Sequence, residues 1–185
     1  MGFRVSKELR YLKRAEWNKL VNSVFNLRDS IIFTIFYETG CTVSELANIK
    51  IKDVTQTQIT ISQRKSIISP VLYAKIQTYL NLEGKNREFL FYSRQSDTIT
   101  EKRIIQIVKF YSKRVGFEVT PQILRYTHMI HAYECNIPIS SIISQVGITK
   151  QRAVQIFSEV TDKDQVQNYS KFYKLEYQDT NDNQG

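Results

Sequence analysis

Cysteine and histidine are scarce in this chain, which has two of each among its 185 residues. Cys41 and Cys135 stand far apart, so the chain has neither the cysteine pattern of a disulfide framework nor the spacing of a zinc site. His128 and His131 lie three residues apart on one expected helix, but no third ligand stands nearby in the sequence. We therefore expect reduced thiols, no metal and no cofactor.

Long apolar runs are also missing. The longest apolar stretch, Ile31 to Tyr37, is far shorter than the about 20 residues that a membrane-spanning helix needs. The first residues lack the apolar segment of a secretory signal peptide. We therefore expect a cytoplasmic protein with no membrane partner, associated with the nucleoid if its source is a prokaryote.

Positive charge is in excess. The chain has 26 Lys and Arg against 18 Asp and Glu, a formal net charge of +8. Such a balance favours a polyanionic partner, most often nucleic acid. The alternative is a protein that is merely soluble and cationic.

Residue periodicity predicts a mainly α domain with a small antiparallel β-sheet. A helix over 28–38 is apolar on all sides and should be buried at the centre, ending at Gly40 in the left-handed conformation. A strand at 58–62 should pair with a return strand at 67–68, with a polar basic tip between them. Other helices are expected at about 14–25, 72–80, 104–115, 121–135, 138–146, after Thr149, and at 163–175.

The domain organisation is expected to be simple. Residues 11–177 should form one domain, after a short basic arm at 1–10 and before a polar, disordered tail at 178–185.

Four segments in sequence order carry a family resemblance. Residues 38–46, ETGCTVSEL, resemble the TG-x-R-x-SEL segment of tyrosine recombinases of the phage integrase family, and residues 120–127, TPQILRYT, resemble their TPH-x-LRHT segment. Residues 146–160 resemble LGH with its downstream tyrosine, and residues 11–16 resemble the start of the catalytic domain. The resemblance spans residues 11–160. It implies the tyrosine recombinase catalytic-domain fold and DNA cleavage through a covalent phosphotyrosine.

The resemblance also implies which side chains should stand at the catalytic positions. Family members have two arginines, acid–base groups and a tyrosine in the active site. In this chain Arg125 matches the second arginine, and either Lys65 or Arg64 is the counterpart of the hairpin lysine. The other positions differ: Thr42 stands for the first arginine, Gln122 for the first histidine, Ile148 for the next histidine or tryptophan and Phe157 for the tyrosine. Loss of a phosphate-stabilising arginine costs roughly 10³ to 10⁵ in rate, and phenylalanine has no nucleophilic oxygen. We therefore expect that the protein is not an enzyme.

Several of these residues have a structural alternative. Thr42 would cap its helix in a box with Glu45, Phe157 would belong to the core, and Arg125 would be either a buried salt-bridge residue or a phosphate contact. The cations Lys150 and Arg152, in the first turn after the Thr149 cap, are either solvated or a phosphate site. The candidate DNA-binding residues are Arg125, Gln122, Arg64, Lys65, Lys150, Arg152, Lys50 and Lys52.

Three functions remain open. The leading hypothesis is a non-catalytic protein that binds double-stranded DNA and acts by occupancy, architecture or regulation, with modest and salt-sensitive binding. The second is an active recombinase or nicking enzyme with a relocated nucleophile, Tyr169 or Tyr173. The third is a protein-interaction partner of an active recombinase. By the same resemblance, the stripe formed by Val166, Tyr169 and Tyr173 is expected to mediate self-association.

Overall fold

The structure, a computed structural model, describes residues 9–83, 87–93 and 96–160. The chain divides into two compact units, Met1–Ile148 and Thr149–Gly185, which are described separately. The elements of the first unit are α1 (Arg14–Ser23), α2 (Leu27–Thr39), α3 (Val43–Ala47), a 3₁₀ turn (Ile51–Asp53), β1 (Gln58–Ile61), β2 (Arg64–Ile67), α4 (Pro70–Glu83), α5 (Glu101–Val115), α6 (Pro121–Glu134) and α7 (Ile139–Val146). In the second unit, a helix spans residues 150–160.

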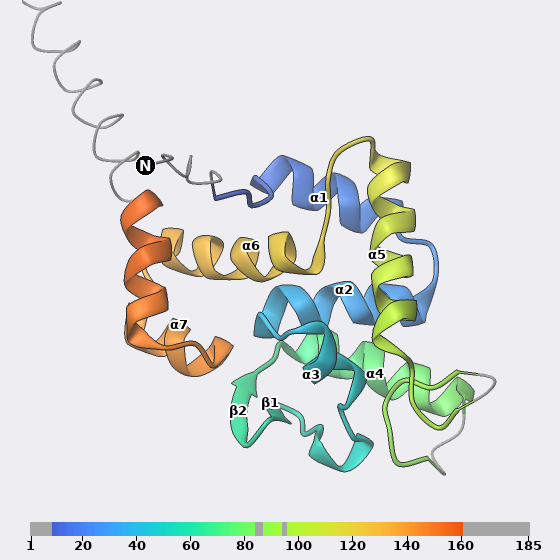
Figure 1. The fold of residues 1–185 in the computed structure, drawn as a ribbon. Helices are drawn as coiled ribbons and strands as arrows, with labels where there is room; N and C mark the ends of the chain where they lie inside the picture. The colour runs from blue at the N-terminus through green and yellow to red at the C-terminus, as the bar shows by residue number, and fades with distance from the viewer. Residues whose placement is uncertain (1–8, 84–86, 94–95, 161–185) are drawn as a thin grey trace, which may run out of the picture. The chain divides into compact units, whose positions relative to one another are not determined.

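Helix α2 is the centre of the first unit. Its Ile31, Ile32 and Phe36 side chains are fully buried, as expected for a helix that is apolar all round. It lies between α6 and α4 and contacts both (Figure 1). Gly40 ends it at φ 59°, and a Cβ there would come within 2.9 Å of Val146 Cγ2, so glycine is needed both for the turn and for the approach of α7.

The β-hairpin begins its second strand earlier than the sequence predicts. Ser62 and Gln63 have φ values of 46° and 70°, which is the two-residue turn with positive φ at both positions, and Ile61 therefore pairs directly with Arg64. The prediction of a basic tip before a return strand at 67–68 is wrong, because Arg64 and Lys65 already belong to β2. In β2, Arg64 is partly buried and Lys65 is exposed, since neighbouring strand residues face opposite sides.

The remaining fold agrees with the predicted class. The structure is mainly helical with a two-stranded antiparallel sheet. The apolar segment at 89–91 is a buried loop joined to Lys50 by one isolated bridge. Of the helices in the described ranges, none is long and apolar enough to cross a membrane. The predicted boundaries of the arm, the single domain and the tail remain predictions.

Candidate nucleic-acid interface

The first part of the site is the start of α3. Thr42 Oγ1 accepts a hydrogen bond from the Glu45 main-chain N–H at 3.2 Å, and Glu45 Oε2 accepts one from the Thr42 N–H at 2.8 Å. This reciprocal pair confirms the predicted capping box. The box also holds the Glu45 carboxylate at a fixed place beside the end of α2.

Arg64 reaches that carboxylate from β2. Its Nη1 donates to Glu45 Oε1 at 2.5 Å and its Nη2 to Glu45 Oε2 at 2.9 Å, so the pair is bidentate. Its Nε donates to the Gln145 carbonyl at the end of α7, at 3.1 Å. The Arg64 and Glu45 side chains are only 14% and 17% exposed. The hairpin arginine therefore faces the site, whereas Lys65 faces away from it.

Arg125 completes the cluster from the second turn of α6. The helix begins as predicted, with Thr120 as N-cap and Pro121 in its first turn. Arg125 Nη1 donates to the Gly40 carbonyl at 2.5 Å and Nη2 to the Val146 carbonyl at 3.2 Å. Its Nη1 also lies 3.8 Å from Glu45 Oε2. The side chain, 12% exposed, thus joins the ends of α2 and α7 and shares one carboxylate with Arg64.

The electrostatics of this cluster favour full ionisation. Burial alone would raise the pKa of Glu45, but the hydrogen bonds from Arg64 and Thr42 and the charges of Arg64 and Arg125 hold it below its ordinary value. Burial lowers the pKa of Arg125, and the Glu45 carboxylate opposes that shift. Arginine nevertheless remains charged at neutral pH. Two guanidinium groups and one carboxylate leave one positive charge in the cluster. We name Glu45, Arg64 and Arg125 the arginine cluster.

The other predicted residues of the first unit lie around or outside this cluster. Gln122 is exposed one turn before Arg125 on α6, and Ile148 is partly buried just after α7. Lys50 pairs with Glu88 at 2.7 Å, and Lys52 is exposed.

Glu45 was predicted only as a capping residue. Its second role, as the shared partner of two arginines, has no signal in the local sequence.

The second unit holds three more predicted residues. Thr149 Oγ1 accepts from the Arg152 main-chain N–H at 3.2 Å, which confirms the predicted N-cap. Lys150 and Arg152 are exposed, and Phe157 is 3% exposed. The Val166, Tyr169 and Tyr173 stripe, with the helix expected at 163–175, lies outside the described residues.

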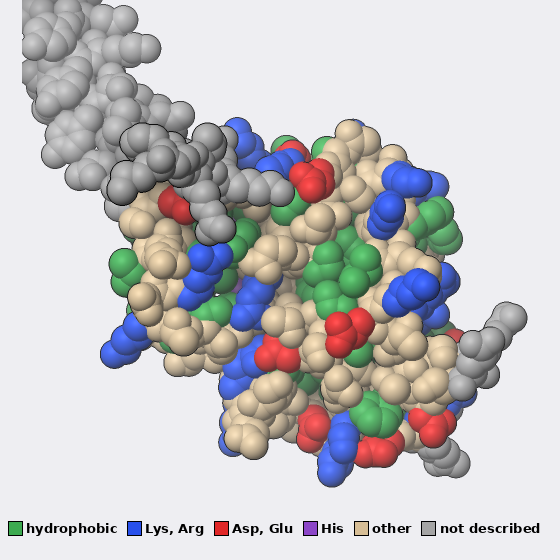
Figure 2. All heavy atoms as spheres, viewed as in Figure 1, with side chains coloured by type: hydrophobic (Ala, Val, Ile, Leu, Met, Phe, Trp, Pro, Cys, Tyr) green, Lys and Arg blue, Asp and Glu red, His purple; other side chains and the backbone are tan. Residues whose placement is uncertain are grey.

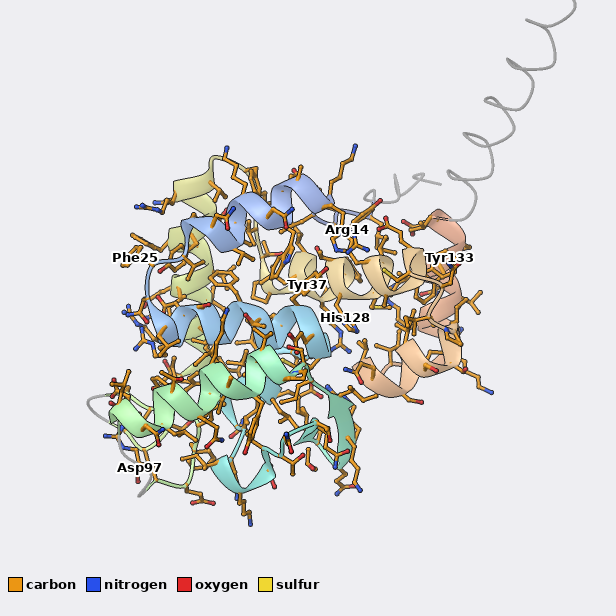
Figure 3. All side chains as sticks on the ribbon, turned by 180° about the vertical axis from the view of Figure 1, so that it is seen from behind. Arg14, Phe25, Tyr37, Asp97, His128 and Tyr133 are labelled. Carbon is orange, nitrogen blue, oxygen red and sulfur yellow. The ribbon has the colours of Figure 1, made fainter. Side chains whose placement is uncertain are left out.

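Behind the arginine cluster, two histidines border a cavity. His128 Nδ1 lies 2.6 Å from the Tyr37 carbonyl oxygen, and His131 Nδ1 lies 3.0 Å from the Tyr37 hydroxyl. Burial lowers the pKa of His128 to about 4 and lowers that of His131 as well. With Arg14, these side chains line a cavity of about 530 Å³. Figure 3 labels Arg14, Tyr37 and His128 among them. The described residues contain no group of three potential metal ligands.

Comparison with known proteins places this geometry in one family. The model of the phage integrase family matches residues 10–164. The tyrosine recombinase XerA of Pyrococcus horikoshii is 32% identical over 163 residues, which are 82% of this chain and 57% of the relative. The tyrosine recombinase XerC of Caldanaerobacter subterraneus is 30% identical over 168 residues, 82% of this chain and 48% of the relative. The chain thus spans about half the length of these relatives.

Solved structures show the same fold. A crystal structure of XerA recombinase matches with a TM-score of 0.76 at 23% identity, over 88% of this chain and 64% of that chain. A crystal structure of XerH site-specific recombinase bound to palindromic difH substrate matches with a TM-score of 0.78 at 16% identity, over 91% of this chain and 54% of that chain.

These likenesses correct one expectation and confirm another. The expectation that the protein is not an enzyme rested on Thr42 and Phe157. It is contradicted, because the relatives are named tyrosine recombinases, which are enzymes. The expected fold is confirmed by the family model and by the structural matches. With the family model matching residues 10–164, the chain belongs to the phage integrase family and has the catalytic-domain fold of the tyrosine recombinases.

Proposed function

We propose that this chain binds double-stranded DNA by contacting backbone phosphates on the face where α3, β2, α6 and α7 meet. The arginine cluster is the observation that carries the proposal, because it concentrates two guanidinium groups on one carboxylate and keeps a net positive charge. Planar guanidinium groups match the oxygens of a phosphate. The +8 charge of the chain supports the same partner. On this proposal the protein works where DNA is, in the cytoplasm, and on the nucleoid if its source is a prokaryote.

The surface around the cluster supports this proposal. Figure 2 shows Lys and Arg side chains beside acidic ones over the region where α3 and β2 lie. Gln122 on α6 and Lys52 in the segment after α3 are exposed, and we propose both as further DNA contacts. Phosphate contacts of this kind fix the position of a protein on DNA but carry no base sequence information.

Replacing Arg125 by alanine is expected to weaken DNA binding by at least about tenfold, because a charge-assisted hydrogen bond contributes about 1.5–3 kcal/mol. The slope of log affinity against log salt should also fall by about 0.9, the value of one lost phosphate contact. Fluorescence anisotropy of a labelled duplex, titrated at several salt concentrations, measures both quantities.

The matched control is Arg28→Ala. Arg28 also pairs with a carboxylate, Asp29 Oδ1 at 3.0 Å, but at the opposite end of α2, about 18 Å from Gly40 along the helix. The affinity of Arg28→Ala for the duplex should equal that of the parent protein. If the parent fails to bind DNA at low salt, or if Arg125→Ala binds as tightly as Arg28→Ala, the proposal is wrong.

The names of the relatives favour a second candidate function, DNA strand cleavage at a specific site. Because Phe157 has no hydroxyl, the nucleophile would have to be another tyrosine, and Tyr169 and Tyr173 are the candidates in the sequence. A nicked or phosphorothiolate duplex should then trap a covalent protein–DNA adduct on denaturing gels. The adduct should disappear in either Tyr169→Phe or Tyr173→Phe. A protein that binds the duplex without ever forming an adduct would exclude this candidate.

We also propose self-association through the segment at 163–175, with the cavity behind the arginine cluster as its receptor on a second copy. The cavity supports this proposal because much of its lining is apolar, including Ile67, Ala132 and Ile142. Sedimentation velocity of the full chain should show a concentration-dependent dimer or larger assembly. Ile67→Lys, which places a charge at the exposed edge of the cavity, should shift the protein to monomer, because Ile67 lines the cavity and is 70% exposed. Equal sedimentation of both proteins would count against this docking.

A further inference from the structure

Three groups meet at one oxygen atom of the arginine cluster. Glu45 Oε2 lies 2.8 Å from the Thr42 main-chain nitrogen and 2.9 Å from Arg64 Nη2. Arg125 Nη1 lies 3.8 Å from the same oxygen. The same carboxylate oxygen therefore lies between the Arg64 guanidinium and the backbone of residue 42. It also lies between the Arg64 guanidinium and Arg125.

From this geometry we propose that Arg64 supplies the second guanidinium of the phosphate-binding site, in place of the arginine that the family motif has where this chain has Thr42. This inference rests on the proposed function, since it names the group that shares one DNA phosphodiester with Arg125. Thr42 is neutral, exposed and engaged as a helix cap, so its side chain adds no charge to the site. Arg64 instead brings a positive charge to the Glu45 carboxylate from β2.

Two separate features of the fold direct Arg64 to this place. The two-residue turn at Ser62 and Gln63 starts β2 at Arg64, and the alternation of the strand turns Arg64 inward and Lys65 outward. At the end of α7, Gly147 has φ 72°, and a Cβ there would lie 3.0 Å from Cδ, Nε and Nη1 of Arg64. The absence of a side chain at Gly147 therefore leaves the space that the arginine occupies.

The net charge of the cluster and the donors of Arg125 fit one phosphodiester. Two guanidinium groups and one carboxylate give a net charge of +1, which balances the single negative charge of a phosphodiester. Among the described residues, Arg125 gives two hydrogen bonds to main-chain carbonyls, out of the five N–H groups of a guanidinium. Its remaining N–H groups can therefore bind phosphate oxygens while Arg64 adds its charge beside them.

A charge relocation experiment tests this inference. Arg64→Ala should weaken binding of a labelled duplex by about tenfold or more and reduce the salt slope by about 0.9. Thr42→Arg combined with Arg64→Ala should recover most of the affinity and the full slope, because the guanidinium returns to the same carboxylate from α3. Arg28→Ala is again the control that breaks an arginine–carboxylate pair without touching the site. If Arg64→Ala does not fold, Arg64→Gln replaces it in both proteins.

The outcomes separate this inference from the proposed function. If the parent binds and Arg125→Ala does not, but Arg64→Ala keeps its affinity and slope, then Arg64 only holds Glu45 and the inference alone is overturned. The same holds if the double variant folds but recovers nothing. A parent protein that does not bind DNA at low salt overturns both proposals. A purely structural role would lower the thermal midpoint of Arg64→Ala without moving the salt slope.

Discussion

Replacing Glu45 by glutamine is expected to lower the free energy of unfolding by about 3 kcal/mol. The neutral amide leaves the guanidinium groups of Arg64 and Arg125, 14% and 12% exposed, without their shared negative partner. Removing one member of a buried ion pair costs about 3–5 kcal/mol. Because the cluster is still partly exposed, we expect the loss for Glu45→Gln at the lower end of this range. Urea denaturation followed by circular dichroism measures the change.

The chain contains a matched control for this substitution. Glu16 closes a second capping box, at the start of α1, where its Oε2 accepts from the Lys13 N–H at 2.8 Å. It also pairs with Arg10 at 2.6 Å, but with side chains that are 40% exposed for Arg10 and 27% for Glu16. Because solvent screens this pair, Glu16→Gln should cost about 1 kcal/mol or less. Equal losses in the two variants would show that Glu45 acts only as a helix cap.

Acidification from about pH 7 to about pH 5 is expected to lower the free energy of unfolding by about 2 kcal/mol through His128. The pKa of His128 is lowered by burial from 6.5 to about 4 in the folded protein. Between these values the unfolded chain binds the proton and the folded chain does not, so the stability present above pH 6.5 is lost as the pH falls toward 4. His131, whose pKa burial also lowers, adds to the loss in the same direction.

The variant that isolates this effect is His128→Gln, which does not titrate and can still donate to the Tyr37 carbonyl. Its stability should vary much less between pH 7 and pH 5 than that of the parent, in urea denaturation at a series of pH values. The lowered pKa values of Glu45 and Glu16 act mainly below about pH 5, because in the unfolded chain these carboxylates have a pKa of 4.5 and are half protonated at pH 4.5. An identical pH dependence in parent and variant would refute the assignment to His128.

Local signals predicted the helices well because each depends on neighbouring residues. The Thr42 and Thr120 caps and the left-handed Gly40 are present as expected.

The hairpin was predicted less accurately. Ser62 and Gln63 are not the Asn-Gly or Asp-Gly pair that typically marks a tight turn, so the sequence did not indicate where β2 begins.

The candidate site was only partly predictable. The family resemblance identified Arg125 and left Arg64 and Lys65 as equal candidates on the hairpin. The strand register, which only the structure shows, turns Arg64 toward Glu45 and leaves Lys65 exposed, and our proposal for Arg64 rests on it. The resemblance also led to the wrong expectation that the protein is not an enzyme, since it weighed single side chains more heavily than the overall likeness to named recombinases.

The sequence by itself determined the family, the order of the helices and most of their ends, because periodicity, capping residues and glycines act over a few neighbouring positions. Only the tertiary structure decided that Arg64 and Arg125 share Glu45. Arg64 is 19 residues from Glu45 in the chain, and Arg125 is 85 residues from the Gly40 carbonyl that holds it. Contacts of that separation depend on how α2, α6, α7 and the hairpin pack together, and no local pattern of residues encodes them.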